Sequence, residues 1–151
     1  MNEVGHFFGK EGAMPGFIRN VPLFLYLFLF YNLLVGLTYY YSPGSNILDI
    51  TIRKILLPSG AYWRLSIRDL FIFMGIFSLY FEIFKSTRAS DRQILEHTLS
   101  FAVFLAFLLE FIFLPHVADS SFLLLGCMSC LDLISGYTIS ISAARRDLML
   151  R

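Results

Sequence analysis

The chain has 151 residues, of which 57% are hydrophobic and only 15% are charged, with a formal net charge of +1. Soluble domains carry about 25% charged residues, and a single core of this size cannot bury so much apolar surface. The mean hydropathy of +0.69 therefore predicts a protein embedded in lipid. The absence of a basic run away from the expected membrane flanks argues against a nucleic-acid partner.

Four segments have the length and composition of transmembrane helices, which need about 20 mostly apolar residues. They predict an all-α membrane protein, a single domain over 1–151, with spans at about 21–41, 66–85, 98–115 and 120–143. The second span is the least clean, because Arg68, Asp69 and Glu82 lie near its ends. The fourth span is the most polar.

The basic residues orient these spans, since Lys and Arg are enriched in cytoplasmic loops. Eight of them lie on one side of a four-span arrangement: Lys10, Arg19, Lys85, Arg88, Arg92, Arg145, Arg146 and Arg151. The other side carries four: Arg53, Lys54, Arg64 and Arg68. Both termini are therefore predicted to be cytoplasmic.

The long connection between the first two spans contains an apolar segment at 47–57 with a few charges. One interpretation is a short amphipathic helix at the headgroup boundary. The other is a strand-like segment docked on a partner. Trp63 and the three Tyr residues at 39–41 fit the aromatic belt of that membrane interface.

Asp132 lies near the middle of the fourth span, about 18 Å from its outer end. Ionisable residues inside a span face protein or water rather than lipid. The same face carries small residues that let another helix approach closely: Gly126, Ser129, Gly136, Ser140 and Ala143. A neutral Asp132 that donates a hydrogen bond to Asn32 or Ser78 is one interpretation. A proton or cation pathway is the other.

Glu110 shares a face of the third span with Ala102 and Ala106, a stripe suited to packing against the fourth span. Asp69 lies at similar depth on the second span, beside Arg68. We expect Arg68 to pair with Glu110 or with Asp69, with the side chains extending toward the headgroups. A relay from Asp69 through Glu110 to Asp132 is the functional alternative. However, about 10 Å of depth separates Glu110 from Asp132.

Cys127 and Cys130 form a C-x-x-C, a spacing that lowers a thiol pKa and permits a disulfide in redox proteins. Four-helix thiol oxidoreductases of the vitamin K epoxide reductase type carry such a pair, but this sequence lacks the second pair they use. We therefore expect two small residues packed in the core. The three His residues are scattered, and no metal-binding or cofactor-binding motif is found, so we expect neither metal nor cofactor.

The second half, from FSLYFEIFKSTRAS through ILEHTLSF and EFIFLP to LDLISGYTISISAARRD, resembles small uncharacterised four-helix inner-membrane proteins of proteobacteria. The resemblance covers about 66–147 and implies topology and a bacterial inner-membrane location, but no activity. It draws attention to two clusters on the predicted cytoplasmic face: Glu82, Lys85, Thr87 and Arg88, and Arg145, Arg146 and Asp147. Positive-inside anchoring is one interpretation; a docking patch for a partner or anionic lipid is the other.

The expected function is non-catalytic: an accessory subunit or an assembly or stability factor of a larger membrane complex. Its expected partners are the lipid bilayer and other membrane-protein subunits, or further copies of the chain. One alternative is an oligomeric proton or cation channel or transporter that uses Asp132 and Glu110. A second alternative is a membrane thiol-redox protein that uses Cys127 and Cys130.

Overall fold

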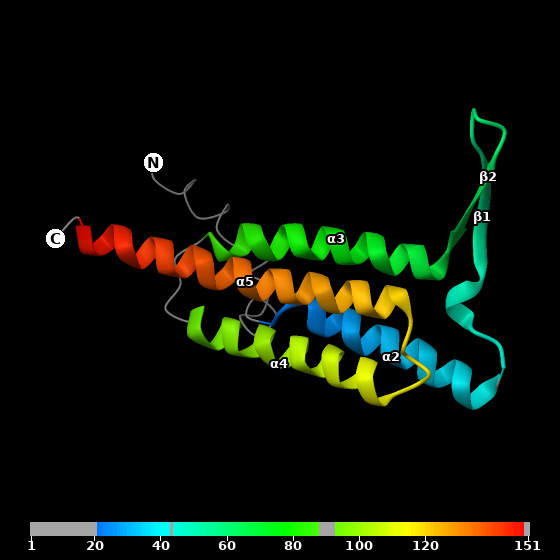
Figure 1. Cartoon of the computed structure of the whole chain (residues 1–151), viewed down its shortest axis with the longest axis horizontal. Helices are drawn as coiled ribbons and strands as arrows, with labels where there is room; N and C mark the ends of the chain where they lie inside the picture. The colour runs from blue at the N-terminus through cyan, green and yellow to red at the C-terminus, as the bar shows by residue number, and fades with distance from the viewer. Residues whose placement is uncertain (1–20, 43, 88–92, 150–151) are drawn as a thin grey trace, which may run out of the picture.

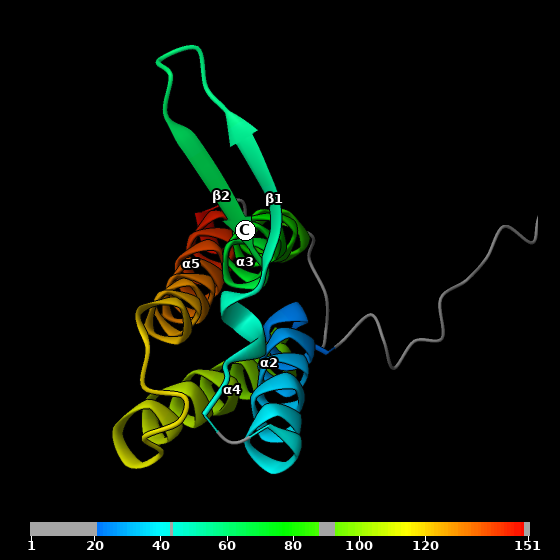
Figure 2. The same ribbon diagram turned by 90° about the vertical axis from the view of Figure 1, so that its right-hand side faces the viewer.

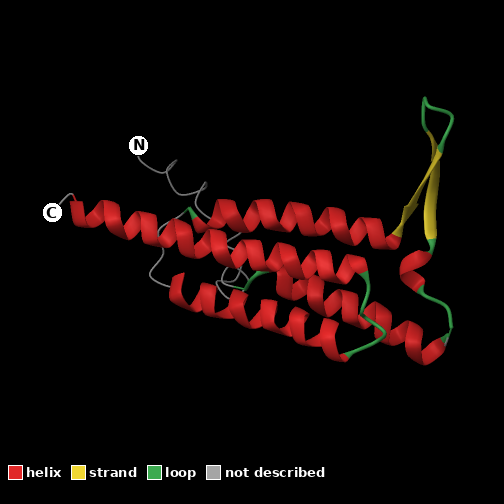
Figure 3. Cartoon of the chain, in the orientation of Figure 1, coloured by secondary structure: helices red, strands yellow, loops and turns green. Residues whose placement is uncertain are grey.

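The computed structural model describes residues 21–42, 44–87 and 93–149. Within these residues four helices lie side by side, as Figures 1 and 3 show. They are α2 (Leu23–Tyr41), α3 (Ile67–Ser86), α4 (Gln93–Phe113) and α5 (Ser120–Met149). A 3-10 turn, η1 (Ile47–Asp49), and a hairpin of β1 (Thr51–Leu56) and β2 (Tyr62–Ser66) join α2 to α3.

The predicted helical fold is confirmed, and three segments are long and apolar enough to cross a membrane. They are Leu23–Tyr41, Leu95–Phe113 and Ser120–Arg146. Helix α3 has a similar length but carries charges near both ends. Only roughly 12 residues separate Asp69 from Glu82, about 18 Å along the axis against a hydrocarbon core of about 30 Å. Whether α3 can span a bilayer therefore depends on how its charged groups are satisfied.

Two helices are longer than the sequence predicts. Helix α4 begins at Gln93 instead of 98, and α5 continues to Met149 instead of ending at 143. The extension of α5 contains Ala and Arg, which favour helix, and Arg146 in the last turn opposes the negative end of the helix dipole. At the end opposite the hairpin, α5 projects beyond the other helices (Figure 1).

The predicted interfacial helix at 47–57 is wrong beyond the single turn of η1. The chain instead forms β1, which pairs antiparallel with β2. Between the strands, the Gly60 N–H donates to the Leu57 carbonyl at 2.9 Å, with Pro58 at the second turn position and Gly60 at φ +82°. A left-handed residue after such a turn is a common hairpin connection, and glycine adopts it without strain. The strand-like interpretation is therefore the closer one, although the pairing partner belongs to the same chain.

The hairpin projects from the bundle at the end where α2 finishes and α3 begins. It runs across the helix axes rather than along them, as Figures 1 and 2 show. The junction is direct, because Ser66 is both the last residue of β2 and the N-cap of α3. Ser66 and Asp69 form a capping box, in which the Ser66 N–H donates to the Asp69 carboxylate at 2.8 Å. This cap holds the hairpin at a defined angle to α3.

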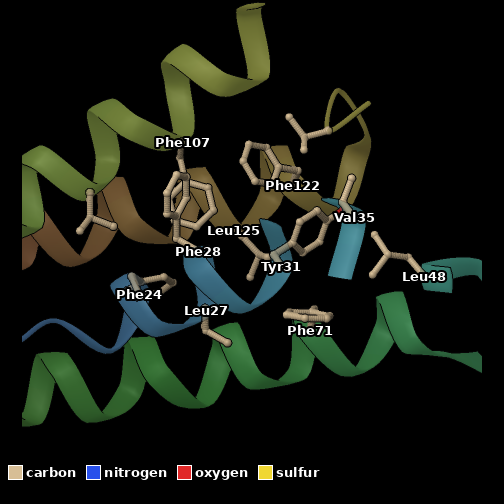
Figure 4. Close-up of a cluster of buried hydrophobic side chains, with 12 residues drawn as sticks. Phe24, Leu27, Phe28, Tyr31, Val35, Leu48, Phe71, Phe107, Phe122 and Leu125 are labelled. Carbon is tan, nitrogen blue, oxygen red and sulfur yellow. The ribbon is translucent and has the colours of Figure 1, made fainter. Parts of the chain in front are cut away.

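The core of the bundle is aromatic and draws on all four helices (Figure 4). The Phe28 ring of α2 meets Phe107 of α4 edge-on at 4.9 Å between centroids. Tyr31 meets Phe71 of α3 at 5.1 Å, and Phe107 meets Phe122 of α5 at 5.1 Å. Edge-to-face pairs such as the first two contribute about 0.5–1.5 kcal/mol each beyond area burial. The core therefore lies nearer the hairpin end of the bundle, which leaves the other half to polar contacts.

Candidate functional site

The first polar group of the bundle is the hairpin-end network, formed by Tyr31, Asp49, Arg68 and Asp119. The Arg68 guanidinium lies 2.7 Å from an Asp49 oxygen and 2.8 Å from an Asp119 oxygen. The Tyr31 hydroxyl donates to the other Asp119 oxygen at 2.6 Å. The network therefore joins α2, η1, α3 and the start of α5 through Arg68 and Asp119.

Asp119 is the centre of this network because it also caps α5. Its Oδ1 accepts hydrogen bonds from the backbone N–H groups of Ser121 at 2.8 Å and Phe122 at 3.0 Å. Burial alone would raise the pKa of Asp119. The hydrogen bonds from Tyr31 and Phe122 and the Arg68 charge outweigh burial, so the pKa lies below its ordinary value of 3.8. Asp119 is therefore charged at neutral pH and binds three helices at once.

Several predicted partners are replaced by others. Arg68 pairs with Asp49 and Asp119 instead of Glu110 or Asp69, and Asp69 serves as the cap of α3. The Asn32 amide donates to the Phe28 carbonyl of its own helix at 3.2 Å instead of reaching Asp132. Glu110 keeps one buried carboxylate oxygen without a hydrogen-bond partner among the described residues.

The second polar group is the carboxylate cluster, formed by Glu82, Ser100, Ser129 and Asp132, which lie on α3, α4 and α5. All four are buried, Asp132 with 4% and Glu82 with 5% of their surface exposed. The Ser100 side chain hydrogen-bonds to Asp132, which also lies in the electrostatic field of Glu82. Within the described part of the chain, Asp132 Oδ2 and Ser129 Oγ have no hydrogen-bond partner.

Glu82 connects the carboxylate cluster to the rest of the bundle. Its Oε1 accepts the backbone N–H of Leu23, the first residue of α2, at 2.6 Å. Its Oε2 lies 3.5 Å from the Lys85 ammonium, which lies 3.8 Å from a Glu96 oxygen on α4. One ammonium thus serves two carboxylates, and Asp132 has no cation of its own in this group.

Small residues bring α5 close to its neighbours, as in the expected packing face. A Cβ on Gly136 would lie 2.7 Å from the His97 ring, and one on Gly126 would lie 3.4 Å from Phe107 Cβ. His97 Nε2 and Ser140 Oγ lie 2.8 Å apart, so a hydrogen bond joins α4 to α5 beside Gly136. On α4, Ala106 is half-buried whereas Ala102 is exposed.

The structure does not bring together the predicted relay from Asp69 through Glu110 to Asp132. The partner of Asp132 on α4 is Ser100, which lies ten residues before Glu110 and therefore about 15 Å from it along the helix. Asp69 lies in the first turn of α3, in the capping box. Glu82, expected near the cytoplasmic surface, is the carboxylate that faces Asp132.

The two thiols are free, and Cys127 is exposed while Cys130 is half-buried. The expectation that both pack in the core is therefore wrong for Cys127, which lies on the outer surface of α5. Among the described residues, no group of three or more His, Cys, Asp or Glu side chains is placed to hold a metal ion. Arg145 and Arg146 are exposed on the projecting end of α5, and Arg88 lies outside the described residues.

Sequence reasoning missed Tyr31, Asp49, Glu96, Ser100 and Asp119 as polar contacts. Only Asp119 has a local signal, because an Asp directly before an apolar helical segment is a typical N-cap. Comparisons with protein families, curated proteins and solved structures gave no match to this chain. The resemblance to proteobacterial inner-membrane proteins stays a prediction.

Proposed function

We propose that the chain is a non-catalytic integral membrane protein, an accessory subunit or an assembly or stability factor of a larger membrane complex. The observation that carries the proposal is the use of its buried charges. Arg68 and Asp119 fasten one end of the bundle, and Glu82 fastens the N-terminus of α2 to α3. Polar groups used in this way stabilise helix packing in a bilayer.

The proposed topology has four spans, with α3 as the fourth, and both termini in the cytoplasm of a bacterial cell whose inner membrane holds the protein. The basic residues support this orientation, because eight of twelve lie on the side of the termini. The charges of α3 support its insertion, because Arg68 pairs with Asp49 and Asp119, Lys85 pairs with Glu82, and Asp69 belongs to the cap.

A docking surface for the larger complex is proposed at the projecting end of α5. Residues 141–146 are exposed there, and the surface carries Arg145 and Arg146 beyond the end of α3 and α4. Its charge favours a membrane subunit with an acidic cytoplasmic surface.

Native mass spectrometry after extraction in a mild detergent tests the proposal. The chain is expected in a stable assembly with other proteins. The Arg145→Glu/Arg146→Glu variant is expected to lose that assembly, whereas Lys54→Glu/Arg64→Glu, an equal charge change at the other end, is expected to keep it. A chain recovered alone, or only with copies of itself, contradicts the proposal.

A second candidate function, proton translocation, is favoured by one observation. Asp132 Oδ2 and Ser129 Oγ are buried without partners in the described structure, close to the second carboxylate, Glu82. Buried carboxylates inside a membrane are typical of proton relays. Purified protein in vesicles is expected to pass protons under this hypothesis, and Asp132→Asn is expected to abolish the flux. Flux that is absent, or unchanged in the variant, rejects it.

A further inference from the structure

The hairpin is the largest described part of the chain outside the helices, and the bundle does not cover it. Every residue of β1 is exposed, and only the last two residues of β2 are half-buried. An isolated two-stranded hairpin is marginally stable in water at best. Something outside the bundle therefore stabilises it.

The two faces of the hairpin have the same mixed chemistry. Residues directly opposite each other share a face, so Arg53, Ile55, Trp63 and Leu65 form one face and Lys54, Leu56, Tyr62 and Arg64 form the other. A hairpin that packs on a protein core has one apolar face toward the core and one polar face toward water. Here each face combines positive charge, aliphatic side chains and an aromatic ring, and the face of Lys54 and Arg64 carries two cations.

The charge on the hairpin has one sign. Lys54 lies directly opposite Arg64, and like charges in this position destabilise a strand pair. Within the described part of the chain, no acidic side chain forms an ion pair with Arg53, Lys54 or Arg64. The carboxylates that flank the hairpin in the sequence, Asp49 and Asp69, are engaged by Arg68 and by the cap of α3. The cations of the hairpin are therefore available to pair with an anion that does not belong to the described chain.

The orientation of the hairpin indicates which anion its cations can reach. It crosses the helix axes at the end of the bundle (Figures 1 and 2), so in the proposed topology it runs parallel to the bilayer plane. Tyr39, Tyr40 and Tyr41 end α2 at the same end of the molecule and are exposed. Aromatic rings at this depth mark the membrane–water interface. The surrounding medium is then the headgroup layer, which is itself partly apolar and partly anionic.

We propose that the β1–β2 hairpin is immersed in the lipid headgroup layer and binds the phosphate groups of anionic phospholipids through Lys54 and Arg64. The bound phosphate lies between the two cations and relieves their repulsion. The apolar and aromatic side chains of both faces contact the boundary between headgroups and acyl chains. The inference rests on the proposed topology, in which α2 and α3 leave and re-enter the bilayer at this end.

Trp63 is the only tryptophan of the chain, so its fluorescence reports on the hairpin alone. The full-length protein is reconstituted in phosphatidylcholine vesicles that contain brominated phosphatidylglycerol or brominated phosphatidylcholine. The ratio of Trp63 quenching by the two brominated lipids gives the relative occupancy of phosphatidylglycerol and phosphatidylcholine near Trp63. We expect a preference for phosphatidylglycerol that declines as salt is added, because salt screens the charges.

The Lys54→Gln/Arg64→Gln variant is expected to lose this preference, by roughly fivefold per charge removed. It removes opposed like charges, so the hairpin itself is not weakened. The matched control, Arg145→Gln/Arg146→Gln, removes equal charge from the far end of α5 and is expected to keep the preference.

Equal quenching by both brominated lipids in the wild type overturns the proposal, as does strong quenching of Trp63 by aqueous acrylamide. Trp63 that is shielded only in the native complex with other proteins also overturns it, since the hairpin then binds a protein. Failure here is separate from failure of the proposed function. The native mass spectrum detects the assembly whatever Trp63 contacts.

Discussion

Replacing Asp119 by Ala tests whether the hairpin-end network holds the bundle together. The change removes three interactions at once: the cap of α5, the acceptor of the Tyr31 hydroxyl and the better-buried partner of Arg68. Asp49, the partner that Arg68 keeps, has a side chain that is 63% exposed. It therefore compensates only weakly for the lost ion pair.

The expected loss can be built from these parts. Loss of an N-cap costs about 1 kcal/mol. A buried hydroxyl left without its charged acceptor costs about 1–3 kcal/mol. The ion pair itself is part-exposed and adds at most about 1 kcal/mol. Asp119→Ala is therefore expected to lower the free energy of unfolding by about 2–5 kcal/mol, a large part of the usual total.

Equilibrium unfolding in mixed micelles of a mild detergent and dodecyl sulfate, followed by circular dichroism, measures this loss. Asp119→Asn keeps the oxygen that caps α5 and places an amide N–H, which can donate to the Tyr31 hydroxyl, where Oδ2 was, so it should cost clearly less than Asp119→Ala. Tyr31→Phe in the Asp119→Ala background should cost less than Tyr31→Phe alone, because its partner is already absent. An Asp119→Ala protein within about 0.5 kcal/mol of the wild type, or strict additivity of the two changes, refutes this account.

Three further predictions concern single positions. Gly136→Ala should disrupt α4–α5 packing, because its Cβ would lie 2.7 Å from the His97 ring. The control, Gly36→Ala, adds a Cβ that meets nothing within 4 Å and should stabilise α2 by up to about 1 kcal/mol. Thermal unfolding of both variants in micelles tests the difference. Asp132→Asn should keep the free energy of unfolding within about 1 kcal/mol of the wild type, because the amide can still hydrogen-bond to Ser100. A larger loss in the same thermal unfolding experiments would show that the Asp132 charge stabilises the bundle. Because the pKa of Asp119 is lowered on folding, the ionised carboxylate contributes fully to folding stability above pH 3.8. That contribution disappears as the pH falls through the lower pKa of the folded state. The melting temperature, measured as a function of pH, should therefore show an acid drop that Asp119→Asn lacks.

The helices were predictable because hydrophobic length is a strong signal in a bilayer. The face of α5 was also accessible, since Gly126, Ser129, Asp132 and Gly136 recur at helical spacing. The partners of Asp132 were not accessible, because they depend on how far each helix is shifted along its axis. Residue depth estimated from span ends placed Asn32 level with Asp132. In the structure, α2 begins beside Glu82 and lies nearer the hairpin end.

The hairpin was predicted only in part, as one of two alternatives, and for a different reason. A short apolar run such as 47–57 has no period that separates helix from strand. The better signal lies just beyond it, in the Pro58–Ser59–Gly60 turn and the β-favouring Tyr62 and Trp63, which together indicate a second strand. A pattern that spans both halves of a hairpin is visible only when the two halves are considered together.

Helix α3 shows why span prediction from one helix at a time is incomplete. By composition alone it is too charged, yet its charges have partners. Arg68 pairs with Asp49 and Asp119, and Glu82 accepts from the Leu23 N–H of α2 and pairs with Lys85 of its own helix. An unpaired charge near the bilayer centre costs about 2.5–3.5 kcal/mol on insertion scales, and pairing inside a bundle removes much of that cost. In the proposed four-span topology, the apolar helices α2, α4 and α5 have the length and composition to enter the bilayer by themselves, whereas α3 depends on them. A four-span bundle would then be a property of the assembled helices, and variants that remove the partners of α3 should expose its charges before they unfold its neighbours.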